Sequence, residues 1–214
     1  MLFRALKKYA VANDVFMLFI DLRRKGLISG VWSMIITNAF MLDDVELWAK
    51  AVEEINENCK NSEATKSPSI FLAGSPLFFP NLKMMELIES SGMHIAVDNL
   101  CTSERLLNDV AYDDASDYGV LRALAESRQF SCECPAFLNN GLKVKNMIYT
   151  MRQHNIKGVI YHVLKGCHSC DLESFSFERE LKENGCRFLR IETDYSYQDR
   201  ENSLIRLEAF KETL

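Results

Sequence analysis

The sequence predicts an α/β fold with a four-stranded parallel doubly wound sheet, helices on both faces and a helical segment in front. Four short apolar stretches, residues 69–73, 94–98, 158–163 and 187–191, alternate with segments of helical periodicity. Such alternation is typical of a doubly wound parallel sheet. The first 60 residues do not alternate in this way, so we expect them to form helices that precede the sheet.

The N-terminal segment contains two predicted helices. Residues 1–25 have a helical pattern, and residues 26–40 are expected to form an irregular connection that includes Ser29 and Gly30. Residues 43–60 then form an amphipathic helix whose apolar stripe contains Cys59. Asp43 and Asp44 are suited to begin that helix.

A polar stretch at residues 61–68 is the expected linker into the sheet. It divides the chain into an N-terminal helical segment, residues 1–67, and an α/β domain, residues 68–214. The helices predicted within the second part cover residues 81–90, a longer segment after Thr102, residues 142–154, residues 172–183 and residues 198–214.

Composition excludes several classes of protein. The 214 residues are 48% hydrophobic and 26% charged, with a net charge of −5, and no dense basic cluster occurs. Nucleic-acid binding through phosphate neutralisation is therefore not expected. The apolar stretch at residues 15–20 is far shorter than the roughly 20 residues that span a bilayer. We predict a cytoplasmic protein that does not enter the membrane.

Unusual residues follow the first three predicted strands. Gly74, Ser75 and Pro76 follow the first strand, Cys101 the second and Cys167 the third. The carboxyl ends of parallel strands share one edge of a sheet, and ligands bind in the crevice there. We therefore expect Ser75, Cys101 and Cys167 to converge. A fourth loop, which contains Cys134, can reach the same edge.

The chain has seven cysteines, an odd number that does not suit a closed disulfide framework. They are Cys59, Cys101, Cys132, Cys134, Cys167, Cys170 and Cys186. Cys59 lies on a core-facing helical stripe and Cys186 at a turn before a strand, so both are expected to be structural. For Cys101, a position near the start of a helix opened by Thr102 or Ser103 would favour the thiolate.

Thiolates are soft ligands that select zinc or iron–sulfur clusters. Cys132 and Cys134 together with Cys167 and Cys170 would supply four sulfurs for zinc. The one-residue gap between Cys132 and Cys134 is shorter than zinc knuckles normally have, which weakens that interpretation. A redox dithiol at Cys167 and Cys170 is also disfavoured, because such a pair belongs after the first strand of its fold.

Four segments resemble successive motifs of the 2-hydroxyacyl-CoA dehydratase and benzoyl-CoA reductase family, the D-component proteins. They are GSPLFFPNLKMMELIESSGMHIAVDNLCTSER, CECPAFLNN, KGVIYHVLKGCH and IETDYSYQDRENSLIRLEAFKE. Their order and spacing match over essentially the whole chain. A typical subunit is about twice as long as this chain. The chain resembles its C-terminal half.

The resemblance implies a [4Fe-4S] cluster, a homologous dehydratase subunit, a separate ATP-dependent activator protein and an acyl-CoA substrate. In the dehydratases, one injected electron forms a ketyl radical on the thioester and allows the 2-hydroxyl group to leave as water. In benzoyl-CoA-type and double-cubane reductases, the same electron delivery reduces an aromatic ring or a small molecule. The motifs leave the choice between these outcomes open.

On this resemblance, Cys167 matches the one cluster ligand that the second half of a typical subunit contributes. One thiolate does not hold a four-iron cluster, so three explanations stay open. Another polypeptide supplies the missing domain, the chain is a truncated relative, or Cys101, Cys134 and Cys170 have taken over ligation. A non-catalytic interaction subunit without a cluster is the alternative from another class.

Two further groups of residues are candidates beside the cluster loop. Gly74, Ser75 and Pro76 are expected to line the substrate pocket, because exposed backbone amides suit phosphate or thioester oxygen. A tight turn into the helix that begins near Pro80 is the open alternative. His162 and His168 flank the cysteine loop. A structural role is the more common one for histidines at strand ends.

Overall fold

The protein is described here by a computed structural model that covers residues 2–107, 114, 116–130, 134–135 and 141–214. Its centre is a four-stranded sheet in the order β2-β1-β3-β4, and all neighbours are parallel. The strands are β1 (Ser69–Gly74), β2 (His94–Asp98), β3 (Gly158–Leu164) and β4 (Arg187–Thr193). The predicted fold class is confirmed, and each strand begins at the predicted residue.

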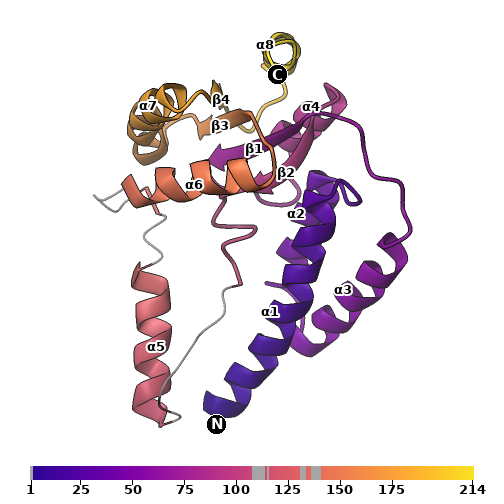
Figure 1. Cartoon of the computed structure of the whole chain (residues 1–214), viewed down its shortest axis with the longest axis vertical. Helices are drawn as coiled ribbons and strands as arrows, with labels where there is room; N and C mark the ends of the chain where they lie inside the picture. The colour runs from indigo at the N-terminus through magenta and orange to yellow at the C-terminus, as the bar shows by residue number, and fades with distance from the viewer. Residues whose placement is uncertain (1, 108–113, 115, 131–133, 136–140) are drawn as a thin grey trace.

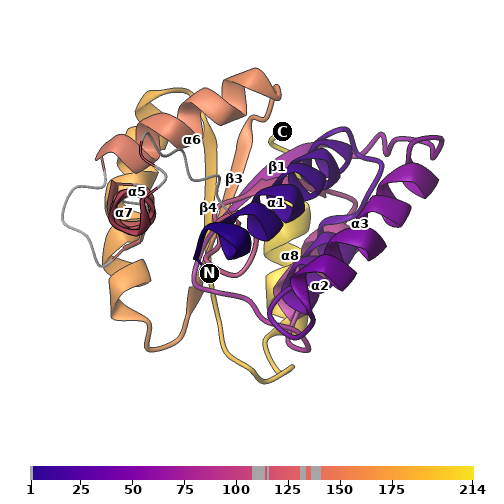
Figure 2. The same cartoon turned by 90° about the horizontal axis from the view of Figure 1, so that it is seen from below.

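Helices cover both faces of the sheet (Figures 1 and 2). One face packs on α4 (Lys83–Ser90) and α8 (Arg200–Lys211), and its core includes Leu72, Ile160 and Leu207. The other face packs on α6 (Gly141–Gln153) and α7 (His168–Glu183), and its core includes Val159 and Phe177. Burial on both faces explains why the central strands are continuous apolar runs.

The N-terminal segment forms α1 (Leu2–Arg24), α2 (Gly30–Ala39) and α3 (Val45–Cys59), which lie on the β2 side of the sheet in Figure 1. Phe16, Phe19 and Trp48 belong to a separate apolar cluster of this segment, against which Cys59 packs half-buried. The cluster also includes Leu107, and the division into residues 1–67 and 68–214 stays a prediction. No helix within the described ranges has the length and apolarity needed to cross a membrane.

The irregular connection predicted for residues 26–40 is wrong, because most of it is the helix α2. Two side chains satisfy the amide groups at its beginning. The Ser29 hydroxyl accepts from the Trp32 amide at 3.2 Å, and the Glu89 carboxylate accepts from the amides of Gly30 at 2.5 Å and Val31 at 3.4 Å. Glu89 belongs to α4, so part of this cap depends on tertiary structure.

Two further helices, α5 (Asp117–Phe130) and α7, begin well away from their predicted first residues. Residues 101–106 form turns, and α5 begins much later than the helix expected near Thr102. The side chains of Thr102 and Ser103 instead bind the carbonyl of Leu77 and the carboxylate of Asp98, both at 2.7 Å. Such side-chain hydrogen bonds compete with helix formation. The second difference is that α7 begins at His168 and not at residue 172.

Candidate functional site

The strand order places a topological switch point at the carboxyl ends of β1 and β3. From β1 the chain crosses to β2 on one side, and from β2 it returns past β1 to β3 and then β4. The direction of winding therefore reverses between β1 and β3, and this is where open α/β sheets bind ligands. The loop after β1 carries Gly74, Ser75 and Pro76, and the loop after β3 carries Cys167.

Gly74 and Ser75 join the two loops directly. Gly74 has a φ of +112°, and a Cβ atom there would lie 1.9 Å from the carbonyl oxygen of His162. The Ser75 amide donates to that same carbonyl at 2.8 Å, and the Ser75 hydroxyl accepts from the Leu164 amide at 2.9 Å. Glycine is therefore required at position 74, and Ser75 is fully buried as the link between β1 and β3.

Two thiols lie beside Ser75 at the beginning of α7. Cys167 is the N-cap residue of this helix and is partly exposed, whereas Cys170 is 2% exposed. Although the Cys167 side chain makes no regular capping hydrogen bond, it lies close to the Cys170 amide. The two cysteines thus share the first turn of one helix with unequal access to solvent.

Their surroundings shift the pKa values of the two thiols in opposite directions. Burial alone would raise the pKa of Cys167, but the Cys170 amide and the side chains of Ser75 and Cys170 outweigh it and lower this pKa. Burial raises the pKa of Cys170 to about 12. Cys167 is therefore the thiol that ionises more readily, as expected at a helix N-terminus.

A buried polar network lies near these thiols on the same face of the sheet. Glu173 of α7 accepts a hydrogen bond from the Tyr161 hydroxyl and forms an ion pair with Lys143 of α6 at 2.9 Å. The side chains of Lys143 and Glu173 are 3% and 1% exposed. Burial raises the pKa of Tyr161, and the Glu173 carboxylate raises it further. The Tyr161 hydroxyl therefore stays protonated and donates to Glu173. The network fixes α6 and α7 against β3.

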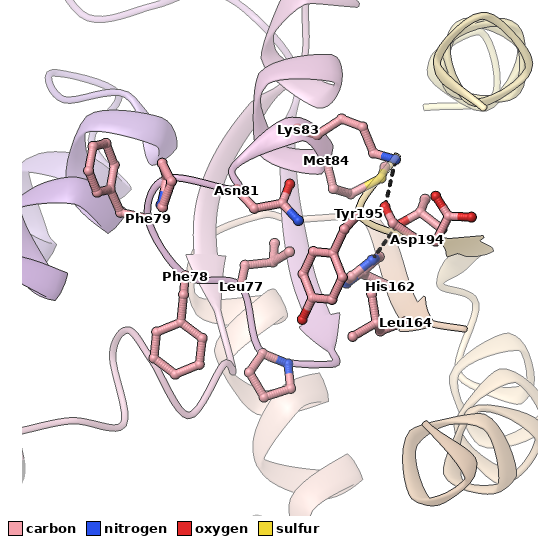
Figure 3. Close-up of a pocket in the computed structure, with 13 residues that line it drawn as sticks. Leu77, Phe78, Phe79, Asn81, Lys83, Met84, His162, Leu164, Asp194 and Tyr195 are labelled. Carbon is pink, nitrogen blue, oxygen red and sulfur yellow. Dashed lines mark hydrogen bonds between the residues drawn. The ribbon is translucent and has the colours of Figure 1, made fainter. Parts of the chain in front are cut away.

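A cavity of about 220 Å³ opens on the opposite face, near the carboxyl ends of β1, β3 and β4. Pro76 and His162 line it, and Figure 3 shows Phe78 and Phe79 on the side opposite Lys83. Its volume is below the 300–1,000 Å³ typical of drug-sized ligands. The cavity therefore suits a small group or one part of a larger ligand.

The two buried basic side chains at this cavity already have partners. Lys83 donates to the carbonyl oxygens of Asp194 at 2.8 Å and Ser196 at 2.6 Å and pairs with Asp199 at 2.6 Å. His162 Nε2 lies 2.8 Å from the Thr193 hydroxyl. Burial lowers the pKa of His162 to about 4, so the ring is neutral near pH 7.

The structure does not place the three predicted cluster cysteines together. Cys101 follows β2, which is separated from β3 by β1, and its side chain is exposed. Neighbouring strands are about 4.8 Å apart, so β2 and β3 are roughly 10 Å apart. Cys134 is half-buried, and Cys132 lies outside the described residues. The described residues contain no group of three or more His, Cys, Asp or Glu side chains that could hold a metal ion.

Asp98, the last residue of β2, has a structural role. Its carboxylate accepts from the Leu100 amide at 3.0 Å and from Ser103 at 2.7 Å, and it pairs with Arg23 of α1 at 2.7 Å. The Arg23 and Asp98 side chains are fully buried. The loop after β2 is thereby tied to α1, and Thr102 of the same loop also donates to the Leu77 carbonyl in the loop after β1 at 2.7 Å.

Comparison with known proteins identifies the family. The family model described as 2-hydroxyglutaryl-CoA dehydratase, D-component, matches residues 1–214. The chain belongs to this family. A relative from Escherichia coli (strain K12), named "Putative dehydratase subunit YjiM", is 25% identical over 148 residues. That match covers 69% of this chain and 38% of the relative, so the chain spans much less than the whole relative.

The family resemblance predicts that this chain contributes one ligand to an iron–sulfur cluster. Cys167 fits one thiolate ligand, because it is partly exposed at the beginning of α7 and its pKa is lowered. Cys170 fits less well, since its sulfur is buried with a raised pKa. The described part of this chain therefore suits one cluster ligand better than a complete ligand set.

Sequence reasoning missed the residues that support this loop. The ion pair between Lys143 and Glu173 joins positions 30 apart, and no local pattern marks either residue as buried. One signal was present for Glu173. It lies three residues after Cys170, which places both on one face of a helix once α7 is extended back to His168.

Proposed function

We propose that the chain is the C-terminal part of an iron–sulfur 2-hydroxyacyl-CoA dehydratase, in which Cys167 supplies one thiolate to a [4Fe-4S] cluster. The observation that carries this proposal is the position of Cys167 at the switch point between β1 and β3, on a family member whose match covers residues 1–214. When bound, the cluster supplies a low-potential electron to the thioester substrate.

This chain's own residues prepare the site in two ways. Ser75 and Gly74 hold the β1 and β3 loops together, so that the Cys167 loop has a fixed position. The amide end of α7 favours the thiolate form that metal binding requires. Of the proposed substrate-binding segment Gly74, Ser75 and Pro76, it is Pro76 on the wall of the 220 Å³ cavity that is proposed to face the acyl-CoA thioester, while Gly74 and Ser75 support it from the sheet.

The proposed assembly contains further polypeptides. The remaining thiolates come from a domain outside this chain or from a homologous dehydratase subunit, and an ATP-dependent activator protein delivers the electron. A cytoplasmic location suits this oxygen-sensitive chemistry. A dry pocket is also required, because water would weaken the electrostatic contacts of the site.

The test is anaerobic reconstitution of the complex. The chain is combined with a homologous dehydratase subunit under reducing conditions, and iron, sulfide and the visible spectrum are measured. We expect about four irons per site, as a thiolate-held cubane requires. Conversion of a 2-hydroxyacyl-CoA to the enoyl-CoA after addition of the activator and ATP then distinguishes dehydration from reductase chemistry.

Two substitutions make the test specific. Cys167→Ala is expected to lose the bound iron, whereas Cys59→Ala is expected to retain it, because Cys59 packs against the α1 and α3 cluster. If Cys167→Ala binds as much iron as the parent chain, the assignment of Cys167 is wrong. A colourless complex without iron would favour the cluster-free interaction subunit.

A further inference from the structure

The first turn of α7 carries a cysteine pair whose chemistry goes beyond metal ligation. Cys167 is the N-cap and Cys170 follows three positions later in the first turn. Side chains three apart on a helix are neighbours, with Cβ atoms about 5–6 Å apart. A disulfide needs Cα atoms about 5.5–6 Å apart and Cβ atoms about 4 Å apart, so a small adjustment of this turn brings the sulfurs into bonding range.

The surroundings of the two sulfurs differ in the way that thiol–disulfide exchange requires. Cys167 is partly exposed and reachable by an incoming disulfide, whereas Cys170 is buried beneath it at 2% exposure. The two side chains are in contact with each other and with Ser75. The exposed sulfur can therefore react first, and the buried one is held beside it for the second step.

Although the pair follows the third strand and not the first, as a thioredoxin-type motif would, its place on the first turn of α7 and its unequal exposure meet the same chemical needs. We propose that Cys167 and Cys170 form a redox-active dithiol that exchanges with low-molecular-weight disulfides. The Cys167 thiolate attacks one sulfur of the disulfide RSSR, forms a mixed disulfide and releases one thiolate, RS⁻. Cys170 then gives up its proton to solvent and attacks the Cys167 sulfur, which releases the second RS⁻. The oxidant RSSR takes up two electrons, and the dithiol becomes one intrachain disulfide.

Three other described cysteines, Cys59, Cys101 and Cys186, lack this arrangement. Cys59, Cys101 and Cys186 have no second cysteine within three positions of the sequence. Cys101 is exposed without a neighbouring thiol on the same turn, so exchange there would stop at the mixed disulfide. Closure of an intrachain disulfide is thus specific to the α7 turn among these positions.

The dithiol also affects the proposed cluster site. A sulfur that is bonded in a disulfide does not act as a thiolate ligand. Oxidation of the pair would therefore remove the ligand that this chain is proposed to supply. The exchange chemistry itself does not depend on the cluster and is tested without iron.

The experiment uses the full chain, freed of metal with a chelator and exposed to oxidised glutathione without oxygen. Remaining thiols are alkylated, and tryptic peptides are analysed by mass spectrometry. Cleavage after Lys165 and Arg179 yields one peptide, residues 166–179, that contains both cysteines. We expect this peptide to lose two hydrogens and to escape alkylation, and added dithiothreitol to reverse both changes.

Three variants assign the steps. Cys170→Ser is expected to stop at a glutathione adduct on Cys167, and Cys167→Ser is expected to lose the reaction because Cys170 is buried. Cys186→Ser, a half-buried cysteine that follows α7, is the matched control and should oxidise as the parent chain does. A parent chain that keeps the glutathione adduct on Cys167, or whose 166–179 peptide stays fully alkylated, would overturn the proposal.

Discussion

Single residues at the end of β1 show which parts of the site the sequence could predict. The glycine at position 74, before Ser75 and Pro76, indicated either exposed amides for a ligand or a tight turn at a strand end, and the buried, hydrogen-bonded Ser75 amide fits the second interpretation. The structure gives the reason, since the Gly74 backbone lies directly against the carbonyl of His162. The hydrogen bonds of Ser75 could not be predicted, because their partners lie on β3.

Gly74→Ala is expected to destabilise the fold strongly. The new Cβ would lie 1.9 Å from the His162 carbonyl oxygen, so the strands must separate locally in addition to the strain of the positive φ. We expect a loss on the order of 2–4 kcal/mol in the free energy of unfolding, measured by urea denaturation.

Gly166→Ala is the matched control for that substitution. Gly166 also has a positive φ, +85°, but a Cβ there would meet no atom within 4 Å. Only the backbone strain, about 1–2 kcal/mol, is then expected. Equal losses for the two variants would show that the contact between Gly74 and His162 is not limiting.

His162 makes the stability of the fold depend on pH. Its pKa in the folded protein is about 4, lowered from the ordinary value of 6.5 chiefly by burial. Between these two pH values the unfolded chain binds a proton that the folded chain does not. Stability that is present above pH 6.5 is therefore lost as the pH falls toward 4, by about 3 kcal/mol in total.

Denaturation of the parent chain and His162→Gln at pH 7 and pH 4.5 measures this effect. Other groups titrate in the same range, and burial also lowers the pKa of His94. The parent and the variant are therefore compared by how much the free energy of unfolding changes between the two pH values. His162→Gln should lose less stability between the two pH values. Equal losses of stability in the parent and the variant would contradict the role assigned to His162.

Among the elements, the strands could be predicted and α2 could not. The strands are short apolar runs bounded by turns, and this local signal survives folding because both faces are buried. The helix α2 depends on Glu89, which is 58 and 59 residues from the amides it binds. The start of α7 was missed for a local reason, since Cys167 is not a residue that usually begins a helix.

The ion pair between Lys143 and Glu173 joins two elements, α6 and α7, and its loss should be costly. Glu173→Ala leaves the Lys143 ammonium buried without its partner and removes the acceptor of the Tyr161 hydroxyl. The expected loss is about 3–5 kcal/mol. Chemical denaturation followed by far-UV circular dichroism measures it.

Glu178→Ala on the same helix is the control for Glu173. Glu178 pairs with Lys182 at 2.6 Å, but the side chains are 37% and 57% exposed. Exposed pairs at this spacing contribute about 0.3–0.5 kcal/mol, so this variant should be close to the parent chain. If both variants lose little stability, water reaches Glu173 and the network is not buried in solution.

At the scale of the whole molecule, the N-terminal helices and the sheet share buried polar contacts. Arg23 of α1 is fully buried and donates to the carbonyl of Ala96 at 3.2 Å, to Ser33 at 3.2 Å and to Asp98 at 2.7 Å. It also pairs with Glu104. A single arginine thus connects α1, α2, β2 and the loop after β2. Its burial could not be predicted, because arginine is usually exposed.

This connection predicts that the two parts of the chain unfold together. Arg23→Met keeps much of the side-chain volume but leaves the carboxylates of Asp98 and Glu104 without their shared cation. We expect a loss of about 3–5 kcal/mol, as for other broken buried ion pairs. Arg122→Ala, which removes an exposed pair with Glu126, should leave the stability almost unchanged. In the parent chain, the fluorescence of Trp32 and Trp48, both in the helical segment, and the far-UV signal should change at the same urea concentration. Separate transitions would show that the two parts fold independently and that Arg23 does not couple them.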